Sequence, residues 1–239
     1  MDVDTTGTDD APVALVTGAN RGTGLAIAAE LHRRGYRVGA LHRTLTGTSW
    51  LHEFPCDLTA PDSIDQAVAA ALDRFGRLDA CVANAAVRRL APVSRLEPAD
   101  WDESVAVNLT AVFRLVRATL PAIRASGGSY VVIGSHAGTH YFEGGAAYSA
   151  TKAALKALVE TLLLEERPNG VRSTLLNPGA IANRYGQGTP LKMATESVAH
   201  WVGALIQDQP ADVAVGEIEL RPARLADPLR AGIARLQHV

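Results

Sequence analysis

The segment AAYSATKAAL places Tyr148 and Lys152 four residues apart within a helical pattern. Residues with this spacing lie on one face of a helix. The same face continues through Leu155, Val159 and Leu162, so the pair begins an inward-facing apolar stripe. A lysine is rarely buried without a partner, and a phenol beside an ammonium group can exchange a proton with a ligand. The pair is a candidate acid–base couple, although the same spacing also occurs in helices that do no chemistry.

The sequence around this pair alternates short apolar runs with helical patterns. The expected strands span residues 12–18, 36–41, 53–58, 78–86, 129–135, 171–179 and 215–222. The expected helices span 24–35, 61–76, 100–126 and 195–207, besides the helix that carries Tyr148 and ends before Pro168. Such alternation produces right-handed crossovers and a parallel sheet that is covered on both faces. We predict an α/β fold with a doubly wound parallel sheet of about seven strands and a binding crevice at their carboxyl ends.

The composition is that of an ordinary globular protein, with 47% hydrophobic and 20% charged residues and a formal net charge of −2. We expect no nucleic-acid or membrane partner, because the net charge is small and no apolar run approaches a bilayer's thickness. Residues 1–11 are expected to form a disordered acidic tail, 12–222 one domain, and 223–239 a helical tail that packs on the domain or an interface. The N-terminal stretch has no secretory signal pattern, so we predict a cytoplasmic protein in which Cys56 and Cys81 are buried free thiols, with no metal site.

A glycine-rich turn, TGANRGTG, joins the first expected strand to the first expected helix. It contains Gly18, Gly22 and Gly24. Glycine allows the chain to turn with positive φ and lets a phosphate approach the backbone. The helix that follows offers unpaired N–H groups and the positive end of its dipole. The turn therefore predicts a phosphate-binding site, although any tight turn can use such glycines.

The glycine spacing G-x-x-x-G-x-G, together with the Tyr148–Lys152 pair, resembles that of the short-chain dehydrogenase/reductase family. The resemblance extends over about residues 12–222. Ser135 ends an expected strand and Tyr148 follows thirteen residues later, the usual interval in the family. Asn108 stands in the middle of a long expected helix, as an asparagine does in the family. The resemblance implies a Rossmann-type single domain and a catalytic tetrad of Asn108, Ser135, Tyr148 and Lys152.

The resemblance also implies a role for each member of this tetrad. Tyr148 would exchange a proton with the substrate oxygen, and the ammonium group of Lys152 would favour its phenolate form. Lys152 would also hold the nicotinamide ribose, and Ser135 would donate a hydrogen bond to the substrate oxygen. Asn108 would anchor a water molecule that links Lys152 to solvent.

Most of the expected cofactor site follows from the same family pattern, including an Asp-Leu pair after the third strand and a Pro-Gly after the sixth. The expected cofactor-binding residues are Gly18, Asn20, Arg21, Gly22, Thr23, Gly24, His42, Arg43, Asp57, Leu58, Asn84, Ala85, Ala86, Tyr148, Lys152, Pro178, Gly179, Ile181 and Asn183. Two of them depart from the pattern, since Ala86 replaces a common glycine and Asn183 a common threonine. Ala86 adds a methyl group near the nicotinamide, and Asn183 can still donate a hydrogen bond.

Cofactor choice is expected to depend on the end of the second strand. Relatives that prefer NAD carry an acidic residue there, which accepts hydrogen bonds from the adenosine ribose. Here the position is His42, and Arg43 follows it. Arg21 stands in the glycine-rich turn, at the second place where NADPH-using relatives carry a basic residue. We therefore predict NADP(H), whose 2′-phosphate pairs well with guanidinium groups.

The expected substrate side mixes aromatic and basic residues. They are Arg88, His136, His140, Tyr141, Phe142, Arg184 and Tyr185. This mixture suits a polar or acidic aromatic carbonyl compound, although both arginines are equally explained as solvated rim residues. His136 and His140 match no catalytic position of the family, so we expect them to line the pocket or to face solvent.

We predict an NADPH-dependent carbonyl reductase, similar in layout to 3-oxoacyl-carrier-protein reductases, that acts on a small-molecule ketone or aldehyde. The same site can also serve a net non-redox step such as isomerisation, dehydration or cyclisation. A nucleotide-sensing protein without turnover is a third possibility, but it has no need of Tyr148. The helix of Tyr148 is also apolar at Ala154 and Leu158, away from the inward stripe. We therefore predict a homodimer or homotetramer.

Overall fold

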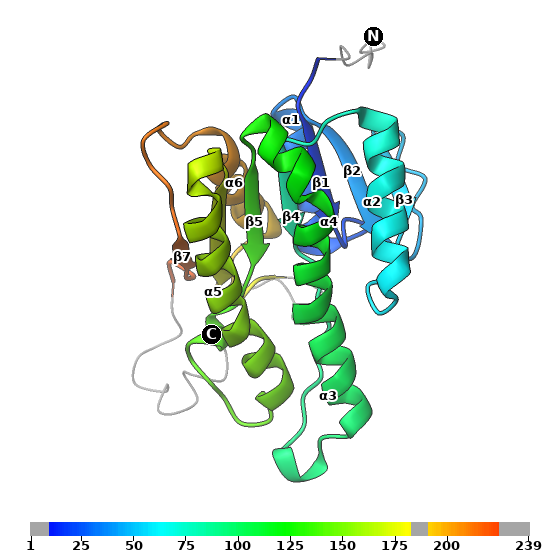
Figure 1. Ribbon diagram of the computed structural model, residues 1–239. Coiled ribbons are helices and arrows are strands. Elements are labelled where there is room, and N and C mark those ends of the chain that lie inside the picture. The colour runs from blue at the N-terminus through cyan, green and yellow to red at the C-terminus, as the bar shows by residue number, and fades with distance from the viewer. Residues whose placement is uncertain (1–9, 183–190, 225–239) are drawn as a thin grey trace.

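The computed structural model describes residues 10–182 and 191–224. Seven strands form one parallel sheet in the order β3-β2-β1-β4-β5-β6-β7 (Figure 1). The strands are β1 Val13–Thr17, β2 Arg37–His42, β3 Leu51–Pro55, β4 Ala80–Ala83, β5 Ser129–Ile133, β6 Arg172–Pro178 and β7 Glu217–Leu220. The α-helices are α1 Gly22–Arg33, α2 Pro61–Phe75, α3 Pro98–Val105, α4 Ala111–Ser126, α5 Ala146–Glu166 and α6 Thr195–Gln207. Short helical turns cover η1 Val93–Arg95, η2 Ala106–Thr110, η3 His136–Gly138 and η4 Arg167–Asn169.

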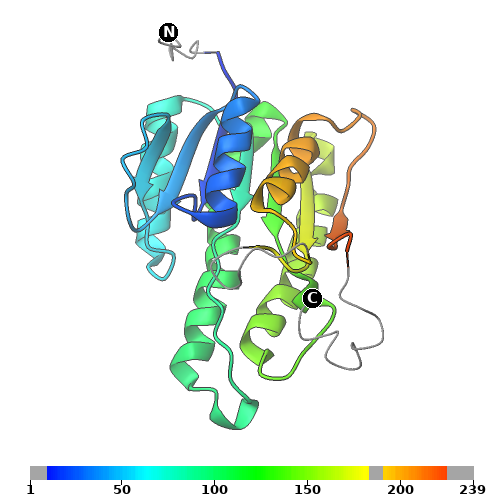
Figure 2. The same ribbon diagram turned by 180° about the vertical axis from the view of Figure 1, so that it is seen from behind.

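The helices form a layer on each face of the sheet. Helices α2, α4 and α5 cover the face seen in Figure 1, and α1 and α6 cover the opposite face, seen in Figure 2. Every residue of β1 and of β5 is buried, as expected for central strands of a parallel sheet. The core is correspondingly divided into two clusters, one on each side of the sheet. The predicted single-domain, doubly wound α/β fold is confirmed.

The ends of the elements have local causes. Proline begins α2, where its missing N–H group costs no hydrogen bond. Glycines end α2 and α4 in the left-handed conformation, with φ of 73° at Gly76 and 60° at Gly127. Only glycine adopts this conformation without strain, so both helices end where their sequences require.

Two differences from the predicted element boundaries bear on the site. Strand β3 begins at Leu51 and ends at Pro55, so Asp57 lies beyond the strand. The helix expected over residues 100–126 consists of α3, the π-helical turn η2 and α4. The extra residue of a π-helical turn is common at functional sites, and this turn contains Asn108.

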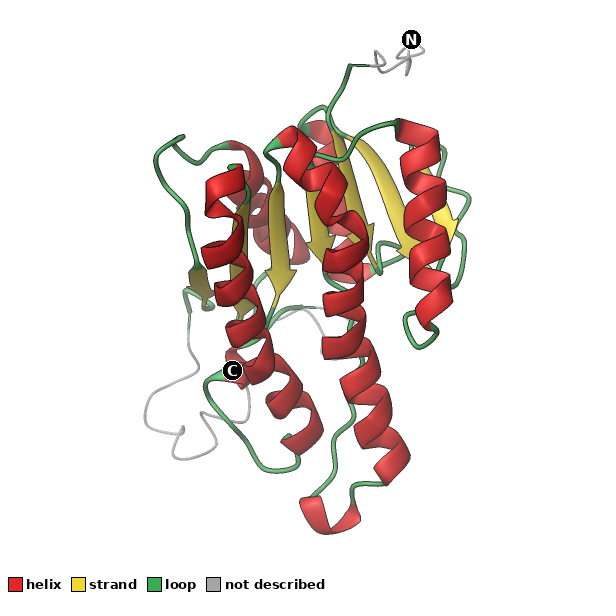
Figure 3. Cartoon of the chain, viewed as in Figure 1, coloured by secondary structure: helices red, strands yellow, loops and turns green. Residues whose placement is uncertain are grey.

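Among the described residues, one helical stretch, Pro98–Ser126, is long and apolar enough by composition to cross a membrane. The sequence alone predicted no such segment. Figure 3 shows this stretch lying along the sheet and extending past the carboxyl ends of the strands. Its α4 part packs on α2 and β4, and Leu115 and Ile123 are buried in the core. This is the placement of a core helix of the α/β fold.

Candidate active site

A cavity of about 760 Å³ opens at the carboxyl ends of the strands. The chain leaves β1 toward β2 on one side and returns to β4 on the other, so β1 and β4 form the point where the strand order reverses. Ligands of doubly wound folds bind at such a point. The cavity is lined by residues from this point and from the ends of β2, β5 and β6. The predicted location of the site is therefore where the cavity lies.

The glycine-rich turn forms one wall of this cavity. Gly18 and Gly22 have positive φ values of 67° and 53°. A Cβ atom on Gly24 would lie 2.1 Å from the carbonyl oxygen of Gly18, so no larger residue fits there. No side chain in the described residues caps the N-terminus of α1 at Arg21. The first N–H groups of α1 are therefore left for an anionic ligand.

The end of β2 forms the far side of the cavity, where Arg21, His42 and Arg43 all line it. His42 Nε2 lies 2.7 Å from Glu53 Oε1, so a carboxylate does stand beside His42, on β3. Burial raises the pKa of Glu53, but hydrogen bonds from Thr46, Gly47 and His42 outweigh it and lower this pKa to about 2. Glu53 itself is not among the cavity-lining residues. The Glu53 carboxylate is therefore stabilised by its hydrogen bonds to Thr46, Gly47 and His42, and it does not face the cavity.

Asp57 and Asn84 shape the cavity between these two walls. Asp57 Oδ1 accepts hydrogen bonds from the backbone N–H and the hydroxyl of Thr59, which lower the pKa of Asp57. Asn84 Nδ2 donates to the carbonyl of Thr17, and Asn84 N–H donates to the Thr17 hydroxyl. Both residues line the cavity. The ends of β1 and β4 are thereby locked together at the point where the strand order reverses.

Lys152 is buried at the base of the cavity with 3% of its surface exposed. Its Nζ donates a hydrogen bond of 2.6 Å to the carbonyl of Ile133 and lies 5.9 Å from the centre of the Tyr148 ring. Burial lowers the pKa of Lys152 to about 8. An ammonium group has three N–H donors, so the hydrogen bond to Ile133 leaves the group able to bind a ligand as well. Lys152 and Tyr148 face the cavity together, as the sequence predicted.

Ser135 lies across the same cavity, directly after β5. Its Oγ accepts a hydrogen bond from Ala137 N–H, and its own N–H donates to Asn177 Oδ1 at 3.0 Å. Asn177 Nδ2 donates in turn to Glu217 on β7. The contacts hold the Ser135 backbone and its oxygen while leaving the hydroxyl proton available to a ligand. Asn177 is a supporting residue that the sequence analysis missed, although it stands directly before Pro178.

Asn108 lies beneath the site and does not line the cavity. It is fully buried in η2, the π-helical turn. Its Oδ1 accepts from Val87 N–H at 2.8 Å, and its Nδ2 donates to the Val87 carbonyl at 2.9 Å and to Thr151 Oγ1 at 3.2 Å. The side chain therefore joins the segment after β4 to α5 one residue before Lys152.

The cofactor residues predicted within the described chain all line the cavity. They are Gly18, Asn20, Arg21, Gly22, Thr23, Gly24, His42, Arg43, Asp57, Leu58, Asn84, Ala85, Ala86, Tyr148, Lys152, Pro178, Gly179 and Ile181. Asn183 lies outside the described residues, as do Arg184 and Tyr185 of the predicted substrate side.

The predicted substrate residues divide into two groups. Arg88 and Phe142 line the cavity, and the Arg88 guanidinium carbon lies 5.8 Å from the centre of the Phe142 ring and 6.0 Å from that of Tyr148. His136, His140 and Tyr141 do not line it. Tyr141 is 66% exposed, and His136 is buried toward Glu219 of β7. The placement of these three residues in the pocket is therefore wrong.

Two charged residues of the rim were missed. Glu103 from α3 and Lys192 both line the cavity. Glu103 belongs to the helix that extends past the sheet, and its ion pair with Arg89 spans 14 residues of sequence. Neither residue belongs to a local motif, so the sequence offered no signal for them.

Comparison with known proteins agrees with this geometry. A family model described as short chain dehydrogenase matches residues 12–192. The D-threitol dehydrogenase of Mycolicibacterium smegmatis is 33% identical over 189 residues, covering 74% of this chain and 73% of the relative. The 3-oxoacyl-[acyl-carrier-protein] reductase of Vibrio cholerae is 33% identical over 178 residues, covering 71% of this chain and 73% of the relative.

Among solved structures, an alcohol dehydrogenase from the archaeon Thermococcus sibiricus complexed with 5-hydroxy-NADP superimposes with a TM-score of 0.82. It is 30% identical and the match covers 90% of this chain and 98% of that one. The chain therefore belongs to the short-chain dehydrogenase/reductase family of oxidoreductases.

Proposed function

We propose that this protein reduces a ketone or aldehyde to an alcohol with NADPH, using Tyr148 as the proton donor. The observation that carries the proposal is the shared cavity. Tyr148, Lys152 and Ser135 line it together with a glycine-rich turn that has uncapped N–H groups. A proton donor, a hydrogen-bond donor and a phosphate site within one crevice are what carbonyl reduction by a dinucleotide requires.

The cavity fits a nicotinamide dinucleotide. Gly24 packs so closely on Gly18 that it holds the start of α1 against the end of β1, and the position of a Cβ atom on Gly22 is open space from which a phosphate can approach the backbone. We propose that this turn holds the pyrophosphate, that Asp57 and Leu58 lie beside the adenine, and that Lys152 holds the nicotinamide ribose. When bound, the dihydronicotinamide supplies a hydride to the carbonyl carbon.

The protein's own groups then handle the proton and the charge on the oxygen. Tyr148 gives its phenolic proton to the carbonyl oxygen, and the neighbouring Lys152 ammonium group stabilises the phenolate that remains. Ser135 donates a hydrogen bond to the same oxygen. Asn108 positions the Val87 segment and Thr151 through its hydrogen bonds. A water molecule near Asn108 that returns the proton from solvent stays a prediction.

We infer a preference for NADPH from Arg21 and Arg43, which line the cavity beside His42. Solved structures of similar fold hold either NADP or NADH, so the fold alone does not select the cofactor. Two guanidinium groups favour a 2′-phosphate through charge-assisted hydrogen bonds. The Glu53 charge does not oppose this preference, because it is paired behind His42 and does not line the cavity. Fluorescence titration at moderate salt should give a Kd at least about tenfold lower for NADPH than for NADH, and equal Kd values would contradict the preference.

For the substrate we propose a polar or acidic carbonyl compound with an aromatic or otherwise flat part. Arg88 lies over the Phe142 and Tyr148 rings, where it can meet a carboxylate beside the reacting oxygen. Lys192 adds a second positive charge to the rim, and Glu103 a negative one. The relatives named above act on a sugar alcohol and on a carrier-bound acyl group, so the family relationship does not choose among carbonyl compounds.

The test is NADPH consumption at 340 nm with a panel of ketones and aldehydes that differ in charge and aromatic content. We expect steady turnover with at least one member, and faster turnover with carboxylated aromatic ketones than with plain alkyl ketones of equal size. Conversion of a substrate without net NADPH consumption would instead indicate isomerisation, dehydration or cyclisation. Tight NADPH binding with no turnover across the panel would favour a nucleotide sensor.

A further inference from the structure

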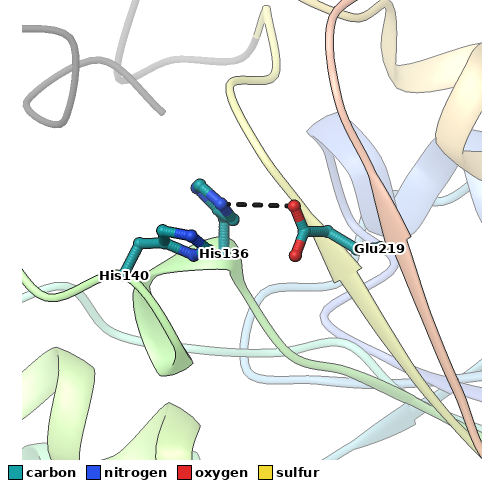
Figure 4. Close-up of side chains that lie close together, drawn as sticks. All are labelled: His136, His140 and Glu219. Carbon is teal, nitrogen blue, oxygen red and sulfur yellow. Dashed lines mark ion pairs between the residues drawn. The ribbon is translucent and has the colours of Figure 1, made fainter.

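His136, His140 and Glu219 form a cluster (Figure 4), and none of the three lines the cavity. The two histidines belong to η3 and the segment that follows it, and Glu219 belongs to β7. Their ligand atoms all lie within 4.8 Å of one another. We propose that this cluster is a binding site for a divalent transition-metal ion, of the kind that Zn²⁺ occupies. This departs from the sequence-based expectation of no metal site.

The state of His136 points to a missing ligand. The residue is 2% exposed, and within the described chain neither of its ring nitrogens makes a hydrogen bond. Its Nε2 is 3.2 Å from Glu219 Oε1, but the contact lacks the alignment of a hydrogen bond. Buried imidazole nitrogens without partners are costly. A metal ion between His136 and Glu219 would satisfy the nitrogen and neutralise the carboxylate at once.

The tautomer of His140 is also suited to a metal. Thr139 Oγ1 lies 3.2 Å from the His136 carbonyl, to which it can donate, and 3.0 Å from His140 Nδ1. When the hydroxyl donates to the carbonyl, His140 Nδ1 is the donor of the second bond, and its Nε2, which makes no hydrogen bond among the described residues, keeps a lone pair for a metal. Metal-bound histidines are usually fixed in this way by a second hydrogen bond.

The geometry and the ligand types indicate Zn²⁺ or a similar ion. Zn–N and Zn–O bonds of about 2.0–2.2 Å place ligand atoms about 3.4 Å apart in a tetrahedron. Because the ligand atoms all lie within 4.8 Å of one another, the cluster needs to close by at most about 1.4 Å, which side-chain rotation can supply. The two rings stack with centres 3.7 Å apart and 26° between their planes, so the partly exposed His140 has to turn out of the stack to direct its Nε2 at the ion. Two imidazoles and one carboxylate leave a fourth position for water.

One positive charge competes with the ion. Arg221 pairs with Glu219 Oε1, but its side chain is 59% exposed and can turn to solvent. The second carboxylate oxygen of Glu219 is also available to the metal.

A metal here would act as a clamp. It would join the turn that begins at Ser135 to the edge strand β7, and it would lie outside the cavity that Tyr148 lines. Since Ser135 is the N-cap of η3, the clamp would also fix the backbone next to a proposed catalytic hydroxyl.

The test uses full-length protein without a histidine tag, stripped with chelator and titrated with Co²⁺ as a spectroscopic probe and with Zn²⁺ by calorimetry. We expect one ion per chain and the intense visible absorption of tetrahedral Co²⁺, together with a higher Tm when Zn²⁺ is bound. The His140→Ala and Glu219→Gln variants should weaken binding at least about tenfold. Both side chains are partly exposed, so these variants are expected to fold.

Two matched controls separate the site from other histidines and from the ion pair. His200→Ala removes an exposed histidine of α6 and should bind both metals as the unmodified chain does. Arg221→Gln removes the competing guanidinium group and should bind as tightly or more tightly. The proposal is overturned if binding does not saturate at one ion per chain, or if His140→Ala and Glu219→Gln bind as tightly as His200→Ala.

Discussion

Lys152 shows how a single buried residue can be costly to the fold and useful to the site. Its pKa is lowered from 10.5 to about 8 by burial, so the folded chain resists holding this charge. In the site, the same charge lies beside Tyr148. The free-energy cost of burying the Lys152 charge is therefore present before any ligand binds. The ribose hydroxyls of a bound cofactor would lower this cost, because they offer the ammonium group further hydrogen-bond partners.

This cost predicts a pH dependence of stability for the cofactor-free protein. The folded-state pKa of Lys152 lies below the unfolded value, so the unfolded chain holds more protons between about pH 8 and 10.5. The Lys152 contribution to the free energy of unfolding therefore rises with pH across that window, after being fully unfavourable below it. Urea unfolding of the wild type and of Lys152→Met, at fixed protein concentration, isolates this contribution as their difference. If the difference between the two free energies of unfolding stays constant from pH 7 to 10.5, burial does not lower the pKa of Lys152 and the prediction is wrong.

Arg43 offers a second test at the scale of one residue. It lines the cavity beside His42, at the rim where a 2′-phosphate would lie. We expect Arg43→Ala to raise the KM for NADPH about 10- to 30-fold, since losing one partner of a charged pair costs about 2 kcal/mol at the lower end of the usual range. The KM for NADH should change little. Arg74→Ala, at an exposed arginine of α2, is the control, and an equal effect on both cofactors would mean that Arg43 does not contact the phosphate.

The sequence predicted individual residues well where a motif fixed them and poorly in the turn after β5. Ser135 and Ala137 line the cavity, whereas His136 between them faces β7. Ser135 is extended and His136 begins the 3₁₀ turn η3, so the two neighbouring side chains leave the backbone in different directions. The family motif fixes Ser135 alone and does not indicate where His136 points.

Among the elements, α4 and α5 are joined by an ion pair that no local sequence pattern predicts. Arg124 Nε donates to Glu166 Oε2 at 2.7 Å, and Asn169 donates to the same oxygen at 2.9 Å. The Glu166 side chain is only 3% exposed, while that of Arg124 is 48% exposed. The Arg124 hydrogen bond lowers the pKa of Glu166, so the carboxylate is charged and depends on this partner. The two residues are 42 positions apart, which sequence periodicity does not connect.

We predict that Arg124→Ala lowers the free energy of unfolding by about 1–3 kcal/mol, because it leaves a buried carboxylate with a weaker set of partners. Urea unfolding at neutral pH measures the change. The control Arg74→Ala should stay within about 0.5 kcal/mol of the unmodified protein. A loss in Arg124→Ala no larger than that of the control would show that the pair contributes nothing to holding α4 on α5.

The helices and strands were predicted best where the hydrophobic periodicity of a segment alone identifies its type. All seven strands and the long helices were found, because buried parallel strands and amphipathic helices carry their own periodicity. The interruption of the 100–126 helix at η2 was missed, because a π-helical turn adds one residue without a distinctive composition.

For the whole molecule, the exposed surface of one helical layer bears on assembly. Phe113 on α4 is 49% exposed and Leu164 on α5 is 53% exposed, and both helices cover the same face of the sheet. Thr161 of α5 is exposed as well, and Ala154 and Leu158 are partly exposed. Apolar groups gathered on one side of a domain favour association with a second copy.

We predict that the protein is a dimer or tetramer with α4 and α5 in the interface. Light scattering after size exclusion at micromolar concentration should give a mass of at least two chains. Phe113→Asp should shift the mass toward one chain, because it places a charge in the apolar contact. Arg74→Ala on α2 is expected to leave the mass unchanged. A one-chain mass for the unmodified protein would refute the prediction.

The central claim for the whole protein is that Tyr148 delivers the proton in carbonyl reduction by a bound dinucleotide. Its most direct test compares Tyr148→Phe with the unmodified protein in NADPH-dependent reduction of the best ketone from the panel, and measures NADPH binding by fluorescence in both. Phe keeps the ring and its packing but has no proton to give. The account predicts turnover at least about 100-fold lower in Tyr148→Phe, the usual contribution of a positioned acid, with the Kd for NADPH nearly unchanged. Reduction by Tyr148→Phe at close to the unmodified rate would contradict it.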